Sequence, residues 1–194
     1  MIRLTFFLNL LYAAYHGFLG IYTRSLWLLI LSAYYSVLSA LRFGVLAYYR
    51  KSARQGDWQA GIFCQLFSGI LLVVLALVLA VAAYLSTVTP VGKAHHLVVM
   101  LSIAIYTFYK TIFAIVCLIR DGNTSSPYVR SIRNINCADG AAAMFSLQRS
   151  MFATFGPGSG RIMNIATGCG VCLLVGLLGL SLVADTAHQH RKEV

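Results

Sequence analysis

Acidic residues are scarce in this sequence, with five Asp and Glu against fifteen Lys and Arg among 194 residues. Charged residues of both signs make up only 10% of the chain, whereas hydrophobic residues make up 59%. So few charges cannot cover the surface of a soluble domain, and the composition predicts a polytopic membrane protein. Carboxylate pairs for catalysis are scarce, and glycine-rich nucleotide loops and GxSxG nucleophile motifs are missing. We therefore expect no catalytic residues, no enzymatic activity and no cofactor.

The five cysteines are an odd number and all fall within hydrophobic stretches, which argues against a disulfide framework. Cys169 and Cys172 are three residues apart and share a helix face, a spacing that would suit a soft metal such as Cu(I) or Zn(II). No histidine or second cysteine pair lies nearby in the sequence to complete a tetrahedral site. We expect both cysteines to pack as small hydrophobic residues, without a metal.

Proline is also rare, and all three prolines fall between long apolar segments rather than inside them. A membrane span needs roughly 20 mostly apolar residues, so the chain has room for about six spans joined by short loops. The sequence predicts an all-α transmembrane bundle with no soluble domain. The expected helices are 2–22, 25–49, 58–85, 95–119, 127–155 and 161–184.

The basic residues account for a net charge of +10. They lie beside the apolar segments, as in proteins that contact anionic lipid, so we expect the lipid bilayer as a partner and no nucleic acid. With the amino terminus inside, nine basic residues fall on the cytoplasmic side and four on the other. The positive-inside rule therefore predicts that both termini lie in the cytoplasm. We expect the protein to reside in the plasma membrane. The nine are Arg3, Arg50, Lys51, Arg54, Arg120, Arg130, Arg133, Arg191 and Lys192; the four are Arg24, Lys93, Arg149 and Arg161.

Asp139 is the one acidic residue inside a predicted span. An ionised carboxylate in hydrocarbon costs about 2.5–3.5 kcal/mol on insertion scales, so Asp139 must pair, reach water or stay protonated. Lys110, in the middle of the fourth predicted helix, is the natural partner. Arg42 lies about two turns from the basic end of its helix, and we expect its side chain to extend toward the lipid headgroups. A structural ion pair and a cation or proton site are both compatible with this pattern.

The helix around Asp139 carries a stripe of small and polar residues at spacings of three and four. Small residues let a neighbouring helix approach closely, so this face should pack inside the bundle, and similar faces make a homodimer possible. The residues of the stripe are Asn136, Asp139, Ala143, Ser146 and Ser150.

The order of residues in the first two predicted helices is of the type N-x-G-x-S-L-x-x-L-x-x-A, carried by Asn9, Gly20, 25–29 and Ala33. Ser126 then leads into a fifth helix with an alanine-rich middle that also bears serines. This layout resembles the membrane domain of the cation diffusion facilitators, which are six-helix zinc and manganese exporters with cytoplasmic termini. The resemblance implies a carrier-like fold.

Such exporters hold their metal with His or Asp residues spaced four apart on the second and fifth helices. The corresponding positions here are Tyr34 and Leu38, and Asn134 and Ala138, none of which is a metal ligand of that kind. Asp139 lies one position away, which turns it by about 100° around the helix. The resemblance therefore implies the fold of such a carrier without its metal site.

Two functions follow from the sequence. The first is a transporter-like membrane protein of unknown solute, for which a cation or a proton is favoured over metal export. The alternative is a non-transporting scaffold or partner subunit that keeps a carrier-like fold. The expected solute or proton path is lined by Asp139, Lys110, Asn136, Tyr34 and Tyr35.

Overall fold

The computed structural model describes residues 2–24, 26–52, 58–88, 97–120, 126–155 and 161–193. Within these ranges the chain forms six helices and no strand, which confirms the all-α prediction. The helices are α1 (Ile2–Thr23), α2 (Leu26–Ser52), α3 (Trp58–Val88), α4 (Leu97–Arg120), α5 (Pro127–Phe155) and α6 (Arg161–Glu193).

The predicted bounds agree with the structure within three residues wherever both ends are described, with one exception. We predicted that the sixth helix would end at 184, but α6 continues to Glu193. Our prediction followed the apolar run, whereas a helix with good helix-forming residues can continue into polar surroundings. The predicted starts of the second helix, at 25, and of the fourth helix, at 95, lie outside the described residues.

A tight hairpin joins α1 to α2. Arg24 has a φ of 51°, in the left-handed region, and its N–H donates to the carbonyl of Ile21 at 3.3 Å. A Cβ at Gly20 would lie only 3.0 Å from Leu29, and the Ser32 hydroxyl donates to the carbonyl of Ala13 at 2.8 Å. The two helices therefore pack in close contact from the turn onward.

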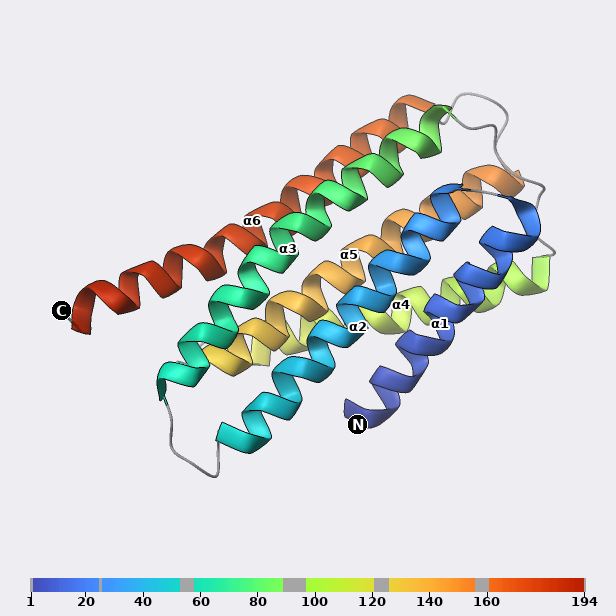
Figure 1. Ribbon diagram of the computed structural model, residues 1–194. Coiled ribbons are helices and arrows are strands. Elements are labelled where there is room, and N and C mark those ends of the chain that lie inside the picture. The colour runs from blue at the N-terminus through green and yellow to red at the C-terminus, as the bar shows by residue number, and fades with distance from the viewer. Residues whose placement is uncertain are drawn as a thin grey trace.

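The remaining helices are arranged around α2 and α5, which contact each other (Figure 1). Helix α1 packs on α2 and α4 packs on α5, so these four helices form one unit. Helices α3 and α6 lie side by side as a pair, and this pair packs on the opposite side of α2 and α5 (Figure 1).

The α3–α6 pair is held by apolar packing and close backbone contact. A Cβ at Gly69 would lie 2.9 Å from the carbonyl oxygen of Gly179, and the reverse distance is also 2.9 Å. Leu182 is fully buried beside this contact, and Leu72 and Leu79 are buried further along α3. Small residues at the crossing let two apolar helices approach closely, as is common between membrane helices.

Four of the helices contain segments long and apolar enough to cross a membrane. The segments lie in α2, α3, α4 and α6: Leu28–Arg50, Gly61–Leu85, Ile103–Arg120 and Ile162–Ala187. Helix α5 is the least apolar of the six, and it lies in the middle of the bundle, where its polar side chains meet other helices rather than the surroundings (Figure 1).

Candidate functional site

Asp139 lies in the middle of α5, with only 1% of its surface exposed. Its Oδ1 accepts a hydrogen bond from Lys110 Nζ of α4 at 2.6 Å. Its Oδ2 accepts from Asn9 Nδ2 of α1 at 2.8 Å and from Arg42 Nη2 of α2 at 3.1 Å. The predicted pairing of Asp139 with Lys110 is confirmed, and one carboxylate joins all four helices of the unit.

The expectation that Arg42 extends toward the headgroups is wrong. Its side chain turns inward, Arg42 is only 5% exposed, and its guanidinium bonds to Asp139. Asp139 projects from α5 at the same height along the bundle, so an ionised partner is within reach. A charge-assisted hydrogen bond is stronger where water is excluded, which favours this contact over extension along the helix.

Lys110 is enclosed by aromatic rings. Its Nζ lies 4.6 Å from the centre of the Tyr35 ring, 5.2 Å from that of Tyr12 and 5.4 Å from that of Tyr106. Ring faces attract a cation at such distances, which offsets part of the loss of water around the ammonium. Lys110 is itself 5% exposed, so the rings and Asp139 replace its hydration.

Asn9 is oriented by Tyr106. The Tyr106 hydroxyl donates to Asn9 Oδ1 at 2.8 Å, so the amide NH₂ group is the side that faces Asp139. A hydroxyl that bonds the carbonyl side leaves only the donor side for the carboxylate. Tyr106 therefore positions Asn9 without touching Asp139 through a hydrogen bond of its own.

Only part of the predicted path surrounds the carboxylate. Tyr35 does so through Lys110, while Tyr34 is buried and its hydroxyl donates to the carbonyl of Ala138 at 3.5 Å. Asn136 is buried one turn from Asp139, but none of the hydrogen bonds that the described residues make to the carboxylate comes from it. Sequence reasoning gave Asn9 no role in the path, although a single amide in an apolar helix is a usable signal.

Further polar side chains continue from Asp139 along the axis of the four-helix unit. His16 is buried, with its ring 4.4 Å from that of Tyr12 and 5.9 Å from that of Tyr35. Thr107 and Ser146, next to Tyr12, are buried too. Seven residues of helix, from Asn9 to His16, rise about 10.5 Å. We call this group the polar core: Asn9, Tyr12, His16, Tyr35, Ser39, Arg42, Tyr106, Thr107, Lys110, Asp139 and Ser146.

Cys169 and Cys172 lie on α6, which contributes no residue to the polar core. Cys169 is exposed and Cys172 is half-buried. In the part of the chain that the structure describes, no three His, Cys, Asp or Glu side chains lie close enough together to hold a metal ion. The structure thus brings no further ligand to this cysteine pair.

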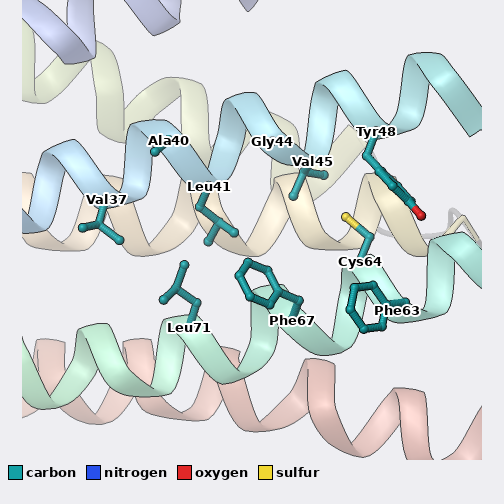
Figure 2. A pocket seen from close by; sticks show the side chains of 10 residues that line it. All are labelled: Val37, Ala40, Leu41, Gly44, Val45, Tyr48, Phe63, Cys64, Phe67 and Leu71. Atoms are coloured by element: carbon teal, nitrogen blue, oxygen red, sulfur yellow. The ribbon is translucent and has the colours of Figure 1, made fainter.

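A separate apolar pocket lies between α2 and α3 and has a volume of 390 Å³ (Figure 2). Its α2 residues follow a different stripe of the helix from Tyr35, Ser39 and Arg42, so the pocket and the polar core use different faces of α2. Figure 2 shows side chains from the two helices pointing toward each other. They are Val37, Ala40, Leu41, Gly44, Val45, Tyr48, Phe63, Cys64, Phe67 and Leu71.

No protein-family model and no curated protein matches this chain. The resemblance to the cation diffusion facilitators therefore stays a prediction from the sequence. The structure does bring together two of the four positions that would correspond to their metal ligands, Tyr34 and Ala138, but neither supplies a metal-binding group.

Proposed function

We propose that this chain is an integral membrane protein with a transporter-like function, in which all six helices lie in the bilayer around the polar core. Four helices have segments long and apolar enough to cross it. Large apolar side chains point outward along the helices, among them Phe63, Leu77 and Ile119. An exposed apolar surface of this kind is favourable in lipid and unfavourable in water.

The observation that carries the proposal is the buried group of Arg42, Lys110 and Asp139. Charged side chains inside a membrane are rare and expensive, and they mark solute or proton paths in transporters. A purely structural ion pair needs one cation for the carboxylate, whereas this carboxylate has two. The second cation adds a cost of burial that a structural role does not require.

Transport also requires that the polar core can open. In this structure Asp139 and Lys110 are closed off from the surroundings, so the conformation corresponds to an occluded state. An opening motion would separate α1 and α4, which meet through Tyr106 and Asn9, and expose the carboxylate. Among cations, a proton suits this site best because it needs no further ligand. A metal ion would need oxygen ligands, and both oxygens of Asp139 already accept hydrogen bonds.

The same closure supports a second candidate function, a non-transporting scaffold or partner subunit. In that case the three charged groups would serve to lock four helices in one register. Buried polar groups specify register in some helical assemblies, although they add little stability. The two functions differ in whether the polar core ever exchanges with water.

Flux measurements on the purified protein in sealed vesicles separate the two candidates. We expect proton uptake, measured with a pH-sensitive dye, to exceed that of empty vesicles. Asp139→Asn should lower this uptake at least about tenfold, and a factor of ten corresponds to about 1.4 kcal/mol of lost interaction energy. Zinc and manganese are included as further solutes. Arg130→Gln is the matched control, since Arg130 pairs with Asp185 outside the polar core.

Flux equal to that of empty vesicles for all three solutes would contradict transport of a proton or of either metal ion. Flux that Asp139→Asn leaves unchanged would remove the carboxylate from the mechanism.

For the cell we propose the plasma membrane as the location. We propose that both termini lie in the cytoplasm, because of the asymmetry of the basic residues.

A further inference from the structure

The polar core carries an excess of positive charge that its own side chains do not neutralise. Arg42 and Lys110 both contact the single carboxylate of Asp139. Helices α1, α2, α4 and α5 together contain no other Asp or Glu in their sequences. With all three groups ionised, the buried cluster therefore has a net charge of +1.

Donor groups are also left over at this place. Arg42 Nε and Nη1 are buried and have no hydrogen-bond partner among the described residues. The same holds, within the described ranges, for the hydroxyl groups of Tyr35 and Ser39. Residues 35, 39 and 42 are four and three apart, so all three side chains project from one face of α2. A buried donor without an acceptor costs about 1–3 kcal/mol, and more when it is charged.

A second group of hydroxyls continues this surface. The hydroxyl of Tyr12 interacts with those of Thr107 and Ser146, and none of the three makes a close, well-aligned hydrogen bond in the described part of the chain. These groups can donate to a bound solute or to waters around it. The polar core thus offers several donors, and its only carboxylate is already saturated.

We infer that the polar core binds a small monovalent anion, such as chloride, nitrate or acetate, beside the guanidinium of Arg42. One negative charge brings the cluster to neutrality, and its lone pairs accept from Arg42 Nε or Nη1 and from the hydroxyls on the same face of α2. A metal or alkali cation is disfavoured, because it would meet a net positive charge and a carboxylate whose two oxygens already accept three hydrogen bonds. Our preference for a cation from the sequence rested on Asp139 alone.

Anion binding can be measured on the purified protein in detergent, without transport. The midpoint of thermal unfolding is followed while sodium gluconate, whose anion is much larger than the other three, is replaced by sodium chloride, nitrate or acetate at constant pH and ionic strength. A ligand that binds only the folded protein raises the midpoint and the effect saturates. We expect a saturable rise for at least one of the three small anions.

Variants set the sign of the effect. Asp139→Asn removes the competing negative charge and should tighten anion binding by about tenfold or more, since charges a few ångströms apart interact strongly in a dry site. Arg42→Gln should abolish the rise in the midpoint. If Arg42→Gln does not fold, Arg42→Lys is measured instead; it keeps the charge and should retain part of the rise. Arg130→Gln, outside the polar core, should behave as the wild type.

The inference is overturned if all anions act alike, if Asp139→Asn weakens the anion effect, or if exchange of sodium for N-methylglucamine lowers the midpoint in the wild type and not in Asp139→Asn. The last result would assign a cation to the site. The inference rests on the proposed transport function only in that a bound anion would then be a transported solute. Anion binding without flux would contradict the transport proposal and keep the anion site. Flux without anion binding would contradict the anion site and keep the transport proposal.

Discussion

Asp139 shows how much depends on the partners of one side chain. Three donors from three other helices meet its two oxygens, and two of these donors have a second constraint. Lys110 is held among rings, and Asn9 is oriented by a tyrosine hydroxyl. An ionised carboxylate is stable in a dry interior only with such a full set of partners. A change in any partner should therefore be felt at Asp139.

Tyr106→Phe tests this constraint at the scale of one hydroxyl. The variant keeps the ring near Lys110 but removes the donor to Asn9 Oδ1, which leaves a buried acceptor without a partner. We expect a loss of about 1–3 kcal/mol in the free energy of unfolding, measured by denaturation in detergent. Tyr109→Phe is the matched control, because Tyr109 is exposed on the same helix.

An unchanged stability for Tyr106→Phe, equal to that of Tyr109→Phe, would show that the tyrosine does not hold the amide.

The partner Asn9 was not predictable from its own helix. The sequence places an amide in an apolar segment, but which helix it faces depends on the rotation of α1 against α2, and that rotation is set by packing at Gly20 and Ser32.

At the scale of elements, the helices follow from the sequence because apolar runs of membrane length have few alternatives. The start of α5 at Pro127 was predicted correctly, since proline fits the first turn of a helix. The pairing of α3 with α6 was not predicted. The apolar patterns of α3 and α6 do not indicate that these two helices form the closely packed pair. The structure shows why Gly69 and Gly179 matter, because the two backbones meet at these glycines.

Gly179→Ala tests that pairing. A Cβ at this position would lie 2.8 Å from the Val73 side chain and 2.9 Å from the Gly69 carbonyl oxygen, so the helices must move apart. Overpacking of this kind costs about 1–3 kcal/mol, and we expect a lower thermal midpoint. Gly170→Ala on the same helix is the control, because its Cβ would meet no atom within 4 Å.

The control also separates packing from helix propensity, since alanine favours a helix over glycine at both positions. Equal midpoints for Gly179→Ala and Gly170→Ala would mean that the α3–α6 contact is looser than the structure shows. A lower midpoint for Gly179→Ala alone would confirm close backbone contact.

At the scale of the whole molecule, an apolar outer surface surrounds a charged interior. Most large side chains on the outside of α3, α4 and α6 are aliphatic or aromatic, while the basic residues gather near helix ends. This distribution inverts the usual order of a soluble protein and suits a bilayer. The four helices with segments long and apolar enough to cross a membrane contact α5, which has no such segment among the described residues.

The placement of both termini in the cytoplasm can be tested with fusions in a bacterial host. Alkaline phosphatase is active only outside the cytoplasm, so we expect a fusion after Val194 to be inactive and a fusion after Val88 to be active. The reason is that an even number of spans returns the chain to its starting side, while three spans do not. Green fluorescent protein at the same two positions should give the opposite pattern, and activity of the phosphatase after Val194 would contradict the topology.

By itself the sequence determined the helical class, the approximate ends of the helices, the apolar exterior and the presence of one acidic residue that needs a partner. These properties depend on local composition and on distances along the chain. Tertiary structure alone decided that Arg42 turns inward, that Asn9 is a third donor, and that two cations share Asp139. Those contacts depend on how four helices are rotated and shifted against one another, and no single helix carries that information.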